Sequence, residues 1–91
     1  RDDGWLQETL ERLTRDCKRL DALLMAAGCS IIGGTPLFRL AEHATAQELA
    51  DRLAQRGIHV RRFTNHPTWL RFGLPGGEEA WQRLAVALTT S

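Results

Sequence analysis

Residues 69–75 read WLRFGLP, and their alternation predicts a β-strand with two different faces. Successive side chains of an extended chain point to opposite sides of a sheet. Three apolar residues share the face that suits a core: Leu70, Phe72 and Leu74. Arg71 is on the other face, between a tryptophan and a glycine. Its planar guanidinium matches a carboxylate or a phosphate there, although a surface arginine paired with a nearby acid would show the same spacing.

The segment before this strand predicts its antiparallel partner. In residues 58–61, which read IHVR, apolar and polar residues alternate as they do in a strand. Residues 64–68 contain Pro67 and are expected to turn the chain back. We therefore expect residues 58–61 and 69–74 to pair as a hairpin.

A further extended region lies nearer the N-terminus. Residues 29–32 and residues 37–41 are both β-prone. Gly33 and Gly34 separate them and predict a bend or a bulge. Pro36 should keep the second piece near a sheet edge or a bulge, because proline cannot donate a ladder hydrogen bond.

Three segments have the periodicity of amphipathic helices. The first is longer than a core this small needs, should end at Gly28, and has an apolar stripe made of Leu6, Leu10, Leu13, Cys17, Leu20, Leu24 and Ala27. The second opens with TAQE at residues 45–48, a capping box, and should end at Gly57. The third follows Pro75 and buries a stripe made of Trp81, Leu84 and Leu88.

These elements predict one α+β domain over residues 1–91. The expected order is helix, strand, helix, strand, strand, helix. Such an order gives a two-layer α/β sandwich, in which helices cover one face of a small, mainly antiparallel sheet. The chain begins at Arg1 rather than at a methionine, and we expect it to be a fragment of a longer protein.

Composition and charge disfavour several classes of partner. Twelve basic and eleven acidic residues leave a net charge of +1, which gives no general attraction to nucleic acid or to an anionic membrane. The uncharged run from Ala22 to Phe38 is interrupted by glycines and a proline, so it does not predict a membrane span. Cys17 and Cys29 lack the spacing of a redox or metal motif, which favours a reduced, cytoplasmic setting.

Residues that commonly carry catalysis are few in this chain. Lys18, the only lysine, falls on the polar side of the first helix, where a solvated ammonium is expected. The three histidines, His43, His59 and His66, are not spaced as metal ligands, and no glycine-rich phosphate loop is present. We therefore predict no metal site and no catalytic residue within this chain.

The motifs together resemble the C-terminal small domain of fold-type-I pyridoxal-phosphate enzymes, the aspartate-aminotransferase superfamily. The resemblance rests on a long leading helix, on GGTPLFRL at residues 33–40, on GIHVR at residues 57–61 and on WLRFGLP at residues 69–75. It implies that Arg71 binds the substrate's α-carboxylate, in a strand of the type L-R-[IFL]-[GS]. The GGTPLF stretch at residues 33–38 is similar to that of threonine-phosphate decarboxylases of cobalamin biosynthesis. These enzymes are themselves similar to histidinol-phosphate aminotransferases.

The resemblance also implies partners and a cofactor. Pyridoxal 5'-phosphate would be held by a large domain, whose Schiff-base lysine and other cofactor residues have no match in this chain. We therefore expect the fragment alone to be inactive and not to hold the cofactor, and to meet its own large domain and a second subunit of a homodimer. The substrate would be a small amino-acid phosphate. The resemblance leaves the small domain of a histidinol-phosphate-type aminotransferase as an alternative. The residues alone leave a non-catalytic α+β module for ligand binding or dimerisation as a further one.

Overall fold

The computed structural model describes residues 2–89, and from residue 4 onward it also describes the side chains. Within this range three helices and four strands follow one another. They are α1 (Asp2–Ala26), β1 (Ser30–Thr35), β2 (Phe38–Glu42), α2 (Ala46–Gln55), β3 (Arg61–Arg62), β4 (Trp69–Gly73) and α3 (Glu78–Thr89). The expected order was wrong at one place, because the first extended region is a hairpin of two strands rather than one strand.

The strands form one antiparallel sheet in the order β1-β2-β4-β3. The predicted pairing of the segment around residue 61 with β4 is confirmed, although β3 is only two residues long. Ile58 and Val60 pack against the core without joining the ladder. The region is therefore apolar on its inner side, as the alternation predicts, but it is paired only where Arg61 faces Arg71 and Arg62 faces Leu70.

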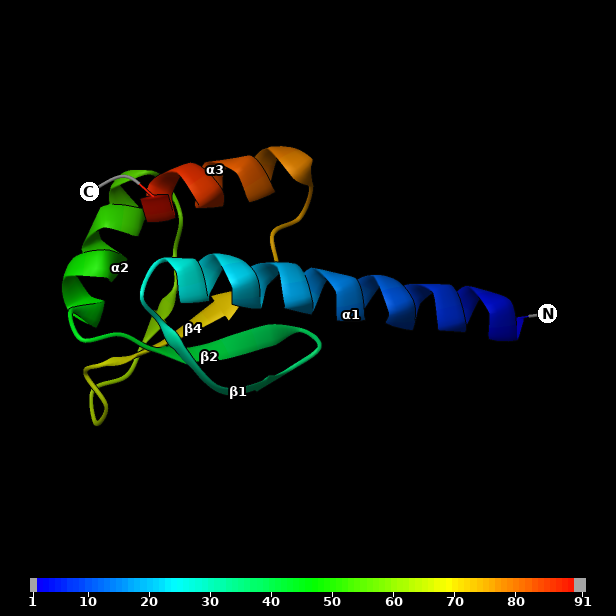
Figure 1. Ribbon diagram of the computed structural model, residues 1–91, viewed down its shortest axis with the longest axis horizontal. Coiled ribbons are helices and arrows are strands. Elements are labelled where there is room, and N and C mark those ends of the chain that lie inside the picture. Colours follow the sequence, from blue (N-terminus) through cyan, green and yellow to red (C-terminus); the bar gives the residue numbers. More distant parts are fainter. Residues whose placement is uncertain (1, 90–91) are drawn as a thin grey trace.

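The three helices lie over the same face of the sheet, which confirms the two-layer α+β sandwich (Figure 1). Between the layers lies a core of leucines with one phenylalanine and one tryptophan, in which the buried residues include Leu20, Leu24, Leu49, Leu53, Leu70, Phe72, Trp81, Leu84 and Leu88. Burial of these side chains supplies the main stabilisation of the fold. The second face of the sheet carries no helix within the described chain.

We expected Gly33 and Gly34 to separate two extended pieces, but they do not. Both lie inside β1, and the ladder shifts register between Ile31 and Gly33, which is the predicted bulge. Gly34 has φ +144°, and a Cβ atom there would lie 2.5 Å from the Phe38 carbonyl oxygen. This close approach requires glycine. The chain reverses instead at Pro36, between the strands. In the sheet order, β1 lies at an edge and β2 does not, so Pro36 does not keep β2 at the edge as expected.

The capping box predicted for α2 is also wrong, although the helix begins at Ala46 as expected. The Thr45 side chain makes no cap hydrogen bond. It lies 3.3 Å from His43 Nδ1, which also accepts a hydrogen bond from the Thr45 N–H. Thr45 thus remains the N-cap residue, but its hydroxyl faces His43 instead of capping the helix. The predicted stop at Gly57 is confirmed, with φ +78°.

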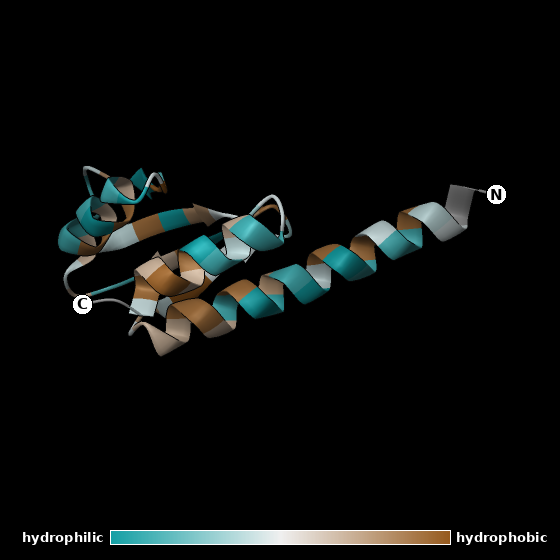
Figure 2. Ribbon diagram, turned by 90° about the horizontal axis from the view of Figure 1, so that it is seen from above, coloured by the Kyte–Doolittle hydropathy of each residue, from teal (hydrophilic) through white to brown (hydrophobic). Residues whose placement is uncertain are grey.

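The N-terminal half of α1 extends beyond the sheet and the other helices (Figure 1). Its apolar stripe is visible along the helix in Figure 2, and the residues there are exposed: Trp5, Leu6 and Leu10. Trp5 is thus no part of this core, whereas Trp81 is buried in it. Within residues 2–89, no helix combines the length and the apolar character that crossing a membrane would require.

Candidate anion-binding site

Arg71 projects from β4 on the sheet face opposite the helices. Its strand neighbours Leu70 and Phe72 are buried in the core, while Trp69 and Arg71 are half-buried. The alternation therefore places Arg71 as the sequence predicts. The bulky apolar side chains of Leu70 and Phe72 fix the orientation of the strand, because a slip of one residue would bury Arg71 instead.

Arg71 has no acidic partner within the described chain. Its guanidinium carbon lies 5.0 Å from the centroid of the Phe38 ring, and no ion pair or hydrogen bond to protein engages it. Glu42 is an acid on the same face, but it lies opposite Trp69 and accepts a hydrogen bond from Thr68 at 3.2 Å. The alternative reading, an arginine neutralised by a nearby carboxylate, is therefore not what this structure contains.

The strand arginines that face the helices behave differently. Arg39 donates from Nε to Asp21 Oδ1 at 2.7 Å and from Nη2 to Asp21 Oδ2 at 3.1 Å. Arg62 donates to Asp51 at 2.7 Å. Their charges are thus compensated on the helix side of the sheet, and the charge of Arg71 on the open side is not.

Arg61 is the functional candidate that the sequence analysis missed. It lies directly opposite Arg71 in the ladder, and its guanidinium carbon is 5.9 Å from the centroid of the Phe63 ring. Like charges placed opposite each other on one sheet face are unfavourable. An anion between the two guanidinium groups would remove this repulsion. The alternation in residues 58–61, combined with the register of the hairpin, could have indicated that Arg61 lies opposite Arg71.

The surroundings of Arg71 are aromatic on one side and open on the other. Trp69 is stacked on His66 with ring centroids 3.7 Å apart and contacts Phe63 edge-on at 6.1 Å. On the other side, a Cβ atom added to Gly73 would meet no atom within 4 Å. Gly73 thus leaves space next to Arg71 along the strand, and Phe38, which lies opposite Gly73, borders this space. Two guanidinium groups beside an open surface can bind a carboxylate or a phosphate.

The other residues that the sequence singled out lie elsewhere. Lys18 is exposed on α1, on the helix side of the sheet. His43 accepts from the Thr45 N–H through Nδ1, which leaves Nε2 to donate to the Ala27 carbonyl at 3.2 Å, so it joins α1 to the start of α2. His59 is exposed. Within residues 2–89, no three side chains of the metal-binding types gather at one place.

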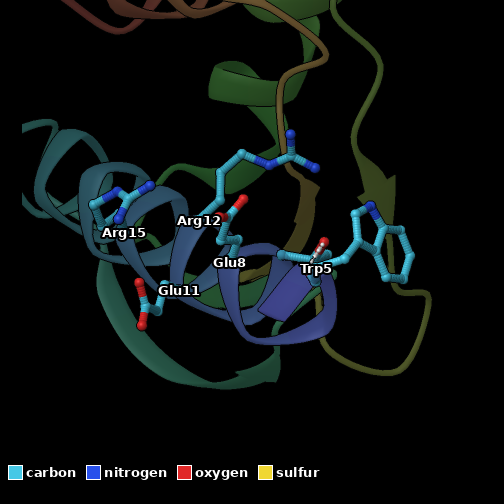
Figure 3. Close-up of a pocket in the computed structure, with 6 residues that line it drawn as sticks. Trp5, Glu8, Glu11, Arg12 and Arg15 are labelled. Carbon is cyan, nitrogen blue, oxygen red and sulfur yellow. Dashed lines mark hydrogen bonds between the residues drawn. The ribbon is translucent and has the colours of Figure 1, made fainter. Parts of the chain in front are cut away.

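Two surface depressions lie away from Arg71. One, of about 390 Å³, lies on the protruding end of α1 and is lined by Trp5, Thr9 and four charged residues, Glu8, Glu11, Arg12 and Arg15 (Figure 3). Figure 3 shows the labelled side chains spreading outward from the helix rather than converging on a point. A second, of about 180 Å³, lies between residues 57–60, which precede β3, the end of β4 and α3. Neither contains Arg71.

Comparison with known proteins gives relatives for most of the chain, although no family model matches it. A threonine-phosphate decarboxylase of a Sinorhizobium species is 49% identical over 69 residues, which are 76% of this chain and 21% of that protein. A second threonine-phosphate decarboxylase, of Pseudomonas aeruginosa, is 43% identical over 77 residues, which are 85% of this chain and 23% of that protein. The chain thus spans about a fifth of the length of these relatives.

A solved structure of a candidate aminotransferase from Burkholderia pseudomallei has the same fold, with a TM-score of 0.74 over 96% of this chain and 28% of that one. The chain thus matches a segment of threonine-phosphate decarboxylases in sequence and a segment of an aminotransferase in fold. The resemblance expected from the sequence motifs is confirmed at this level. The identity to the Burkholderia protein is 24%, so that likeness shows the aminotransferase fold and nothing about its chemistry.

The residues of this aminotransferase-fold segment do not fit the cofactor. Pyridoxal phosphate is bound by its enzymes through a Schiff base to a lysine. Lys18 is exposed on α1, whereas Arg71 lies on the opposite side of the sheet. A cofactor linked to Lys18 would therefore not adjoin Arg71. Arg71 and Arg61 are suited to binding an anionic ligand, and no described residue beside them is suited to holding the cofactor.

Proposed function

We propose that this chain is the C-terminal, substrate-binding small domain of a pyridoxal-phosphate-dependent enzyme that decarboxylates L-threonine O-3-phosphate in cobalamin biosynthesis, in the cytoplasm. The names of the two relatives support the reaction. The observation that carries a substrate-binding role is the position of Arg71. It is half-buried on the open sheet face, lies opposite a second arginine, and forms no ion pair with any residue that the structure describes.

In this proposal Arg71 binds one anionic group of the substrate and thereby fixes the orientation of the whole molecule. A guanidinium offers two parallel N–H donors that match a carboxylate or phosphate. Because Arg71 is on a strand, its backbone is held by the ladder on both sides. Orientation by a rigidly placed group determines which substrate bond is presented for cleavage. Arg61, opposite, would contact the same anion or the second anionic group of the substrate.

The remaining parts of the active site would come from outside this chain. A large domain would hold the cofactor, and a second subunit of a homodimer would complete the site. The open sheet face and the protruding part of α1 are the surfaces available for those contacts. Such contacts would also cover the exposed apolar residues of α1.

A domain replacement tests this function. The matching segment of the Pseudomonas aeruginosa threonine-phosphate decarboxylase is replaced by this chain, to which it is 43% identical. The chimaera is expected to bind the cofactor and to release CO₂ from threonine phosphate. Arg71→Lys in the chimaera should raise KM and lower kcat/KM, because lysine keeps the charge and loses the two-point geometry. A chimaera that folds and binds the cofactor but releases no CO₂ would favour a non-catalytic binding module instead.

A further inference from the structure

Phe38, on the neighbouring strand β2, contacts the Arg71 guanidinium with its ring. In the ladder, Leu40 lies opposite Arg71 and Phe38 lies opposite Gly73. Phe38 is therefore one of the two diagonal neighbours of Arg71 on β2, with Glu42 the other, and aromatic and long side chains can bridge this spacing. The guanidinium carbon of Arg71 is 5.0 Å from the centroid of the phenyl ring. Both residues are half-buried.

This contact differs in kind from the contacts of the other strand arginines. Two N–H groups of Arg39 donate hydrogen bonds to the Asp21 carboxylate and are therefore not available to a ligand. An aromatic ring attracts a guanidinium through the negative electrostatic potential of the ring face. It accepts no conventional hydrogen bond and contributes no negative charge. The ring can therefore restrict the side chain of Arg71 while its N–H donors and its charge remain available.

Restriction matters here because arginine has many rotamers. A free arginine side chain loses close to the largest rotamer entropy of any residue when it is fixed by a ligand. A side chain that is already held by a ring loses less on binding, so the affinity for the anion rises. The corresponding contact of Arg61 with Phe63 is longer, at 5.9 Å, so Arg71 is the more restricted of the two arginines.

We propose that Phe38 is a positioning residue, which holds the Arg71 guanidinium by a cation–π contact in the orientation that binds the anionic group of the ligand. The proposal rests on the anion-binding role given to Arg71 above. It assigns a function to an aromatic residue on the open face of the sheet. It also predicts that the electron density of the ring, and not only its volume, affects anion affinity.

The test measures anion binding by this chain directly. The arginine side-chain N–H signals are followed by NMR while inorganic phosphate or acetate is added. In the free protein, the Arg71 signals should carry the upfield shift of a proton near a ring face. Phe38→Leu should remove that shift and weaken phosphate binding about threefold to fivefold, the range expected of a cation–π contact at a partly exposed site. Phe63→Leu should leave the Arg71 signals in place.

A second variant separates electrostatics from packing. Incorporation of a ring-fluorinated phenylalanine at position 38 keeps the size of the ring and weakens its negative face. Phosphate affinity should then fall although the protein melts as the parent does, and this variant also replaces Phe38→Leu if that protein does not fold. Unchanged affinity in a folded Phe38→Leu or fluorinated protein would overturn the role of Phe38. If Arg71→Gln binds phosphate as the parent does, the anion-binding role of Arg71 itself fails.

Discussion

Arg39 and Asp21 form a two-point ion pair that joins β2 to α1, with Nε–Oδ1 and Nη2–Oδ2 distances of 2.7 and 3.1 Å. Both side chains are about four-fifths buried, at 19% and 22% exposure. The pair lies on the helix side of the sheet, so it fixes the long helix to the strand adjacent to β4. The position of Arg71 relative to α1 therefore depends on this contact.

Disrupting this pair should destabilise the fold. We expect Arg39→Lys to lower the free energy of unfolding by about 1 kcal/mol and Asp21→Asn by about 2 kcal/mol, since the second leaves a largely buried guanidinium without its anion. Urea denaturation measures both values. The control is Arg83→Gln, which removes an exposed pair with Glu79 at 4.0 Å and should change stability by about 0.5 kcal/mol or less. Equal effects of Arg39→Lys and Arg83→Gln would contradict this assignment.

Glu78 gives the fold a dependence on acid pH. Its two carboxylate oxygens accept hydrogen bonds from Arg19 at 2.9 and 2.7 Å, and this contact lowers the pKa of Glu78 below its ordinary value of 4.5. A lowered pKa in the folded state contributes stability at pH values above 4.5 that is lost as the pH falls through the lowered pKa. Unfolding followed from neutral to acid pH should show this loss, and Glu78→Gln should reduce its slope. An unchanged slope in Glu78→Gln would show that other carboxyl groups cause the acid sensitivity.

Gly34 is required by the hairpin of β1 and β2, and Gly33 is not. Gly34→Ala should lower the free energy of unfolding by about 2 kcal/mol or more, because a Cβ atom would contact the Phe38 carbonyl oxygen at 2.5 Å and the residue has φ +144°. Gly33→Ala meets no atom within 4 Å and should change stability by less than about 1 kcal/mol. Thermal melting of the two variants compares them. Similar melting temperatures would mean that the close approach at Gly34 is relieved at little cost.

The exposed apolar stripe of α1 should cause this chain to self-associate at high concentration. Trp5, Leu6 and Leu10 are 68%, 51% and 50% exposed. The double variant Leu6→Glu with Leu10→Glu should reduce association seen by sedimentation, because it interrupts the apolar surface without touching the core. Leu37→Glu, at a more exposed position in the hairpin turn (69%), is the control and should have no effect. Equal effects of both changes would place the contact elsewhere.

Local periodicity was sufficient to predict much of this fold. The stripes of α1 and α3 and the alternation in β4 follow from single segments, so the sequence alone predicts the helices, the core residues Leu70 and Phe72, and the outward side of Arg71. Burial of apolar side chains acts on each of these segments separately. The prediction that the helices cover one face follows from the same patterns.

Features that depend on contacts between segments were not predictable in this way. The role of Gly34 depends on the carbonyl of Phe38 in the next strand, and the failure of the Thr45 cap depends on His43. Arg61 was overlooked because its importance comes from facing Arg71 across the ladder. The contact of Phe38 with Arg71 likewise requires the register of β2 against β4, which residue spacing does not fix.

The sheet separates compensated from uncompensated positive charge. Arg39 and Arg62 form ion pairs with carboxylates on one side, whereas on the other side the described contacts of the Arg61 and Arg71 guanidinium groups are with phenylalanine rings. In a chain with a net charge of +1, the positive charge of the strand arginines that no carboxylate compensates thus lies on one side of the sheet. A small anion diffusing nearby is attracted to one side and turned before it touches the protein, over a range that dissolved salt shortens.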